Sequence, residues 1–232
     1  MEVSERYAQV RKRVDEAAAR CGRDPSEVTL LAVTKTHPVS EINEAIDAGA
    51  TDIGENRVQE LLAKYDDVKP VRWHLIGHLQ TNKVRQVIDK VVMIHSVDSL
   101  KLAEEIDKRA SAHGIVMDVL IEINSAMEET KSGIAAGELR KLAEDITAGC
   151  ASVRIRGIMC IPPIAEDPED SRPYFKEAAE LFREMKTWDL PADRFSPDVL
   201  SMGMSGDFEA AVEEGATIVR VGSSIFGPRN YR

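Results

Sequence analysis

The stretch TLLAVTKTHPVSEINEAIDAGATDIGEN, residues 29–56, contains one complete strand–helix–strand unit. TLLAVTK (29–35) is a short apolar run of the strand type. The segment 39–50 has the periodicity of a helix, and Gly49 is suited to its end. Its apolar positions fall on one helical face: Val39, Ile42, Ala45 and Ile46. A second strand is expected at 52–54, so the unit is the βαβ building block of a parallel sheet.

The same alternation continues to the end of the chain. Further strands are expected at 71–76, 91–95, 117–123, 155–161, 199–202 and 217–221. Further helices are expected at 3–20, 56–65, 82–89, 98–113, 137–148, 172–187 and 206–214. The strands are short and apolar on both faces, which is typical of a parallel sheet covered by helices. Eight strands with helices between them predict an α/β fold, a (β/α)8 TIM barrel.

We expect one domain over residues 1–232, with the helix at 3–20 as an addition to the barrel. Only SSIFGPRNYR (223–232) follows the eighth strand, which is too short for a full closing helix, so the N-terminal helix is expected to fill that place. The alternative is an open doubly wound sheet, but no GxGxxG follows the first strand. The acidic, proline-rich segment 162–173 is interpreted as a solvated connection, and a lid is the less favoured interpretation.

Composition excludes several classes of protein. The formal net charge of −10 argues against general affinity for nucleic acid or for an anionic membrane. No apolar run approaches the ~20 residues needed to span a bilayer, and the N-terminus has no signal-peptide pattern. The three cysteines lie far apart with no CxxC, so we expect reduced thiols and a cytoplasmic location.

Polar residues stand where the predicted strands end, which is where barrel proteins carry their chemistry. Lys35 is the strongest candidate among them for a functional role, because its backbone continues a buried strand. Burial there would lower the pKa of the lysine and favour the neutral amine, which attacks aldehydes to form imines. The competing interpretation is a lysine that extends from the strand end to solvent.

Two glycine- and serine-rich turns follow the last two predicted strands. SMGMSGDFEAA (201–211) leads from a strand into a helix, and RVGSSIFG (220–227) follows the next strand. Exposed backbone N–H groups in such turns can bind an anion, and the loops after strands seven and eight are a frequent phosphate site in this fold. The alternative is that the glycines serve tight turns only.

Arg220 lies within the apolar run IVRVG and therefore needs a buried acceptor. Glu55 could supply one, and so could a nitrogen of a ligand ring. The histidines His74, His78 and His95 match no zinc spacing, so we expect them to form hydrogen bonds and we predict no metal site. The sequence also has no P-loop, no GxSxG and no cysteine–histidine signature.

At these motifs the sequence closely resembles the pyridoxal phosphate homeostasis proteins (the YggS/PROSC family), whose fold is like the N-terminal barrel of alanine racemase. The matching stretches run from residue 30 to residue 227: LLAVTKTHP, IGENRVQE, WHLIGHLQTNK, IHSVDS, INSAMEETKSG, RGIMCIP, LSMGMSGD and RVGSSIFG. Their order and combination are specific, although each is weak alone. One small departure is Thr34, where a serine often precedes the lysine.

The resemblance implies that pyridoxal 5′-phosphate is the cofactor and that Lys35 holds it as a Schiff base. It implies that Ser201, Gly222 and Ser223, with the backbone of 203–205, hold the phosphate. It also implies that Asn56 and His74 lie near the cofactor and that Arg220 faces the pyridine nitrogen. The full set of expected cofactor-binding residues is Lys35, Asn56, His74, Ser201, Met204, Ser205, Arg220, Gly222 and Ser223.

The expected role is a monomeric carrier or regulator of vitamin B6 without catalytic turnover, which passes the cofactor transiently to apoenzymes that depend on it. An arginine cannot keep the pyridine nitrogen protonated as an aspartate would, so the cofactor would be a poorer electron sink. One enzymatic alternative is an amino-acid racemase, which needs a second acid or base opposite Lys35. The other is a Schiff-base aldolase acting on a sugar phosphate.

Overall fold

A computed structural model describes residues 1–125, 132–163 and 167–228 of the chain. Its eight parallel strands form a closed barrel in chain order. The strands are β1 Thr29–Val33, β2 Asp52–Glu55, β3 Arg72–Leu75, β4 Met93–Val97, β5 Met117–Ile123, β6 Val153–Cys160, β7 Phe195–Ser201 and β8 Ile218–Val221. The predicted (β/α)8 barrel is therefore confirmed, and the open doubly wound sheet is wrong because β1 pairs with β8 as well as with β2.

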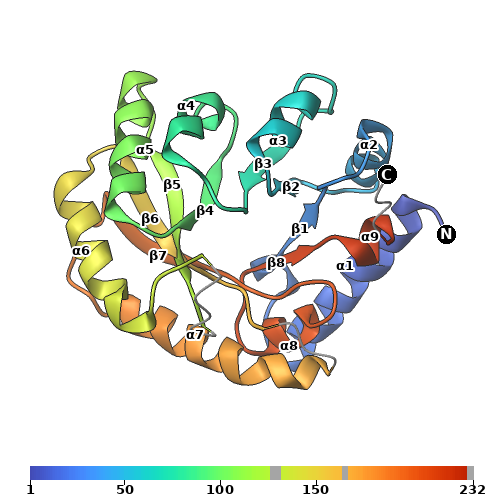
Figure 1. Ribbon diagram of the computed structural model, residues 1–232. Helices are drawn as coiled ribbons and strands as arrows, with labels where there is room; N and C mark the ends of the chain where they lie inside the picture. The colour runs from blue at the N-terminus through green and yellow to red at the C-terminus, as the bar shows by residue number, and fades with distance from the viewer. Residues whose placement is uncertain (126–131, 164–166, 229–232) are drawn as a thin grey trace.

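Helices lie outside the strands and cover the barrel (Figure 1). They are α1 Val3–Arg20, α2 Val39–Asp47, α3 Val58–Lys64, α4 Val84–Val87, α5 Leu100–Ala112, α6 Leu139–Gly149, α7 Arg172–Met185, α8 Phe208–Glu213 and α9 Ser223–Phe226. Short 3-10 turns precede α4, α6 and α7, at Thr81–Lys83, Ala136–Glu138 and Pro168–Ser171, and another, Pro25–Glu27, precedes β1.

Alternation along each strand divides the core into two parts. Leu31 and Val33 of β1 belong to a small apolar cluster inside the barrel, whereas Leu30 and Ala32 belong to the larger cluster between strands and helices. The inner cluster is completed by Ile76, Met93, Leu120, Met159, Val199 and Ile218. Successive side chains of a strand point to opposite faces, which is why one apolar run supplies both layers.

The N-terminal helix closes the place where a helix after β8 would lie. Helix α1 packs against α2, α8 and the single-turn α9 (Figure 1). Its apolar stripe is buried there, and Arg13 and Arg20 form ion pairs with Glu209 and Glu213 of α8. The expectation that the extra helix fills this place is confirmed.

Element boundaries differ from the prediction mainly at β7. The strand begins at Phe195, not at 199, and includes Pro197. Its pairing with β6 shifts register between Ile155 and Gly157, where two steps of β6 face four steps of β7. Proline is tolerated in a strand at such an irregular position, because no ladder hydrogen bond requires its missing N–H.

Residues 164–166 of the segment interpreted as a connection or lid, and residues 126–131 of the motif INSAMEETKSG, lie outside the described residues. Among the helices of the described ranges, none has the length and apolarity to cross a membrane. Cys21 is exposed, Cys150 and Cys160 are buried, and all three are free thiols.

Candidate functional site

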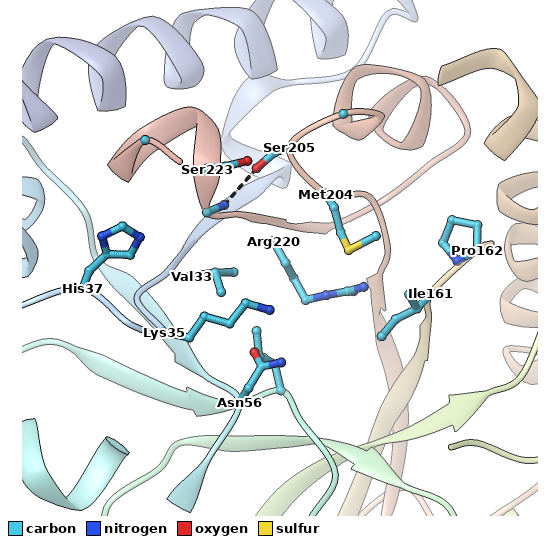
Figure 2. A pocket seen from close by; sticks show the side chains of 14 residues that line it. Val33, Lys35, His37, Asn56, Ile161, Pro162, Met204, Ser205, Arg220 and Ser223 are labelled. Carbon is cyan, nitrogen blue, oxygen red and sulfur yellow. Dashed lines mark hydrogen bonds between the residues drawn. The ribbon is translucent and has the colours of Figure 1, made fainter. Parts of the chain in front are cut away.

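A cavity of about 460 Å³ opens at the C-terminal ends of the strands. It brings together residues of β1 and β8, residues that directly follow β1, β2, β3 and β6, and the turns before α8 and α9. Its walls combine apolar side chains with a few polar groups (Figure 2). Val33, Lys35, His37, Asn56, Ile76, Ile161, Pro162, Met204, Ser205, Gly206, Arg220, Gly222, Ser223 and Gly227 line it. A concave, largely apolar site with few convergent polar groups is typical of a small-molecule site.

Lys35 extends into this cavity from the end of β1. Its side chain runs past Val33 and Asn56 towards Arg220 (Figure 2), so the alternative of a lysine turned to solvent is wrong. The next residue, Thr36, has φ of 67°, which is left-handed backbone that a β-branched residue rarely adopts. Strain of this kind persists only where surrounding contacts hold it, and it is found preferentially at functional sites.

Those surrounding contacts come from α3 and β2. Lys64 Nζ donates to the Thr34 carbonyl at 2.9 Å and to Glu55 Oε1 at 2.7 Å. The Thr36 N–H donates to Glu60 Oε2 at 2.8 Å, and the Thr34 hydroxyl donates to Glu55 Oε1 at 2.7 Å. The turn that carries Lys35 is thus held on both sides of that residue. Thr34 is linked to the buried ion pair Lys64–Glu55, and Thr36 is linked to Glu60.

We expect Lys64→Met to destabilise the protein by about 3 kcal/mol at pH 8, because it leaves the buried Glu55 carboxylate without its cation. Burial raises the pKa of Glu55, and Lys64 is the main influence opposing that rise. A carboxyl whose folded pKa lies above its unfolded value favours the folded state at low pH and opposes it as pH rises through the folded pKa. Urea unfolding should therefore show a smaller deficit at pH 5 than at pH 8.

The double variant Glu55→Gln/Lys64→Met is the control for this prediction. It removes both charges, so most of the stability lost at pH 8 should return. An equal deficit at the two pH values, with no recovery in the double variant, would show that the ion pair does not carry the effect.

A second wall of the cavity is made by the turns before α8 and α9. Ser205 Oγ accepts hydrogen bonds from the backbone N–H of Gly222 at 3.1 Å and of Ser224 at 3.4 Å. The first of these is the dashed line in Figure 2. Two backbone donors thus converge on one oxygen at the rim of the cavity, which is the arrangement that binds a phosphate oxygen.

The glycines of these turns are needed for close approach. A Cβ on Gly222 would lie 3.3 Å from the Val33 carbonyl oxygen, and a Cβ on Gly203 would lie 2.5 Å from the Ala211 Cβ. Gly203 also has φ of 89°, which favours glycine. Gly222 therefore allows the turn before α9 to pack against Val33 at the end of β1, close to Lys35.

Arg220 lies at the floor of the cavity. Its Nη1 donates to Ser201 Oγ at 2.8 Å and its Nη2 donates to the Cys160 carbonyl at 2.9 Å. The expectation that Glu55 could accept from Arg220 is wrong, because Glu55 faces Lys64 and Thr34 on the other side of β2. Burial lowers the pKa of Arg220, but arginine remains a cation at neutral pH.

His74 and Ser201 are not among the residues that line the cavity. Both are buried inside the barrel, where His74 bonds to Asp52 and His95 and where Ser201 bonds to His95 and Arg220. Of the nine residues expected to bind a cofactor, the other seven do line it: Lys35, Asn56, Met204, Ser205, Arg220, Gly222 and Ser223.

Sequence reasoning missed His37 and the apolar walls. His37 lines the cavity, stacks on Phe226 of α9 at 4.8 Å and bonds through Nδ1 to Glu41 at 2.8 Å. Its position two residues after Lys35 was a usable signal, because the turn after a barrel strand supplies site residues. Ile76, Ile161 and Pro162 follow strand ends in the same way and give two apolar sides for a flat ring.

The polar groups fit a phosphorylated aromatic aldehyde better than a metal. Asn56 Oδ1 is buried beside the cavity without a hydrogen-bond partner, which leaves an acceptor for a ligand. In the described ranges no group of three His, Cys, Asp or Glu side chains is placed to hold a metal ion. His78 is more than half exposed and faces Asp98 at 3.6 Å.

The barrel, the lysine directed into its mouth and the paired glycine–serine turns define a protein of the alanine racemase N-terminal type. The sequence model of that family, "Alanine racemase, N-terminal domain", matches residues 6–230. The chain belongs to this family and, within it, to the pyridoxal phosphate homeostasis proteins. It is 47% identical to the protein of that name from Aquifex aeolicus, over the full length of both, and 42% identical to that of Escherichia coli K12, over 99% and 98% of the two chains.

Solved structures agree with this membership. PipY of Synechococcus elongatus PCC7942, solved with pyridoxal phosphate bound, is 36% identical and superposes with a TM-score of 0.78 over 97% of this chain and 100% of its own. Alanine racemase from Streptomyces lavendulae superposes with a TM-score of 0.71 at 20% identity, and this chain covers 57% of it. The latter likeness concerns the fold alone.

Proposed function

We propose that this protein binds pyridoxal 5′-phosphate reversibly, with Lys35 as the amine that holds it in a Schiff base, and that it serves the homeostasis of this cofactor in the cell. One observation carries the proposal. The amine of Lys35 points into a cavity whose rim also carries two backbone N–H groups, those of Gly222 and Ser224, which converge on Ser205 Oγ.

Each part of the cavity has a part of the cofactor to hold. The turns at 203–206 and 222–224 would bind the phosphate, and Arg220 would donate to the pyridine nitrogen. Ile161, Met204 and Val33 would flank the ring, and Asn56 would offer its buried Oδ1 to a polar substituent. PipY, a relative 36% identical, was solved with pyridoxal phosphate bound, which supports the same ligand here.

The role of a carrier follows from what the residues can do with the cofactor. When bound, pyridoxal phosphate supplies an aldehyde that condenses reversibly with amines. Arg220 donates hydrogen bonds and so does not keep a pyridine nitrogen protonated, which weakens the cofactor as an electron sink. Among the described residues that line the cavity there is no carboxylate that could move a proton at the α-carbon of an amino acid.

Borohydride reduction tests the proposal directly, because it converts a Schiff base into a stable secondary amine. Protein incubated with pyridoxal phosphate, reduced, digested and mapped by mass spectrometry should carry the adduct on Lys35. The exposed Lys69, which pairs with Asp47, is the internal control and should remain unmodified at equimolar cofactor. Adduct spread over surface lysines with none on Lys35 would refute the proposal.

Intact, unreduced protein loaded with pyridoxal phosphate separates a carrier from a racemase. Incubation with alanine in D2O should bring no deuterium to the α-carbon above the rate given by free pyridoxal phosphate. We further propose that the protein acts as a monomer in the cytoplasm and gives the cofactor to apoenzymes that require it. The three free thiols are compatible with a reducing compartment.

A further inference from the structure

A continuous chain of polar side chains crosses the inside of the barrel below the cavity. His74 Nε2 lies 2.9 Å from Asp52 Oδ1, and His74 Nδ1 lies 2.9 Å from His95 Nε2. His95 Nδ1 lies 3.1 Å from Ser201 Oγ, which accepts from Arg220 Nη1 at 2.8 Å. None of the five side chains belongs to a residue more than 4% exposed, so bulk water does not compete for these bonds.

The hydrogen bonds around Asp52 fix the protonation state of its carboxyl group. Burial alone would raise the pKa of Asp52, but hydrogen bonds from His74, Arg72 and Thr51 outweigh it and hold that pKa below its usual range. The carboxylate is therefore ionised, and Arg72 already neutralises it through two hydrogen bonds of 2.9 and 2.6 Å.

Starting from Arg220, the direction of each hydrogen bond follows from the one before it. Arginine has no acceptor, so Ser201 Oγ accepts from Arg220 Nη1, and His95 Nδ1, the other hydrogen-bond partner of that hydroxyl, accepts the Ser201 proton. His95 therefore carries its proton on Nε2 and donates it to His74 Nδ1; burial lowers the pKa of His95 well below its usual value, in agreement with a single proton on the ring. His74 then donates from Nε2 to Asp52, which as a carboxylate can only accept. Ser201 donates its only proton to His95 and keeps its oxygen lone pairs for Arg220.

We propose that His95 is a positioning residue for Arg220 and acts through Ser201. By accepting the Ser201 proton, His95 turns that proton away from the guanidinium, which would otherwise face it. The Cys160 carbonyl holds the other end of the guanidinium, so Arg220 is fixed in plane and depth at the floor of the cavity (Figure 2). This inference rests on the proposed function only in giving Arg220 a cofactor ring to face.

The proton positions can be measured without any cofactor. Nitrogen-15 chemical shifts of the imidazole rings in the apoprotein should show both His74 and His95 as neutral tautomers protonated on Nε2, assigned by comparison with the His74→Gln and His95→Gln variants. A His95 ring protonated on Nδ1, or a positively charged ring at either position near pH 7, would reverse the chain and overturn the proposal.

Two substitutions at His95 test its effect on the bound cofactor. Gln can accept from Ser201 through its oxygen and donate to His74 through its nitrogen, whereas Leu can do neither. Pyridoxal phosphate should dissociate about tenfold faster from His95→Leu, as expected for losing one buried hydrogen-bond link, and within about threefold of the wild-type rate from His95→Gln. Equal rates in the two variants would overturn the proposal.

A double-mutant cycle separates positioning from general loss of stability. If His95 acts through Arg220, then His95→Leu should add little to the faster dissociation caused by Arg220→Gln, and full additivity would contradict the proposal. Ser201→Ala removes the intermediate link with a small change in volume and should reproduce the effect of His95→Leu if that variant folds poorly. Failure of the Lys35 adduct would refute the proposed function, yet the tautomers in the apoprotein would still decide this inference.

Discussion

Lys35→Ala is expected to abolish the Schiff-base absorption of the protein and to weaken pyridoxal phosphate binding by about 100-fold or more. The variant keeps Arg220 and the two turns that are proposed to bind the phosphate, so residual non-covalent binding should remain, but the covalent link is lost with its amine. Absorption spectra and equilibrium dialysis, with wild-type protein measured in parallel, would give both quantities.

Lys35→Arg is the matched control, because it keeps a positive charge and a long side chain at the cavity but cannot form an imine. It should lose the Schiff-base absorption as completely as Lys35→Ala while retaining more of the affinity. A variant lacking Lys35 that still showed the full absorption band would mean that another amine holds the cofactor. The assignment of Lys35 and its cavity as the cofactor site would then be wrong.

Gly157→Ala is expected to destabilise the barrel by about 4 kcal/mol or more, enough to leave little folded protein. Gly157 has φ of 141°, and a Cβ there would lie 1.9 Å from the Val199 carbonyl oxygen of β7. Backbone atoms cannot give way as the end of a side chain can, so β6 and β7 would have to separate. Thermal unfolding, or the yield of soluble protein, measures this outcome.

Gly149→Ala provides the comparison within the same βα neighbourhood. Gly149 ends α6, its φ is not positive, and a Cβ there would meet nothing within 4 Å. This substitution should stabilise the protein by about 0.5–1 kcal/mol, because alanine loses less backbone entropy in a helix. Equal behaviour of the two variants would contradict the account of Gly157.

The order and type of the elements could be predicted from the sequence because the hydrophobic patterns are strong. Each strand carries an apolar run and each long helix an apolar stripe, and eight such pairs permit few architectures. The start of β7 could not be predicted, because Pro197 argues against a strand unless the register shift beside Gly157 is known. The single turn α9 is too short to show any period.

The candidate site was predictable where a residue ends a strand. Lys35, Asn56, Arg220 and the two turns were found in this way, and they line one cavity. The sequence could not show how far below the mouth of the barrel a side chain lies, because inward-facing residues at successive levels of a strand have the same sequence pattern. His74 and Ser201 therefore lie under the cavity and not in it, and the acceptors of Arg220 prove to be Ser201 and a carbonyl, not Glu55.

The hydroxyl of Ser205 has a consequence for how tightly such a protein can hold its ligand. This oxygen accepts hydrogen bonds from the backbone N–H groups of Gly222 and Ser224. If the phosphate binds at this turn as proposed, it would exchange one set of hydrogen bonds for another, so the net gain in free energy would be smaller than for donors with no partner, and its departure would leave no N–H group without an acceptor. For the proposed role as a carrier, such an exchange of hydrogen bonds would favour rapid release of the ligand to the next protein.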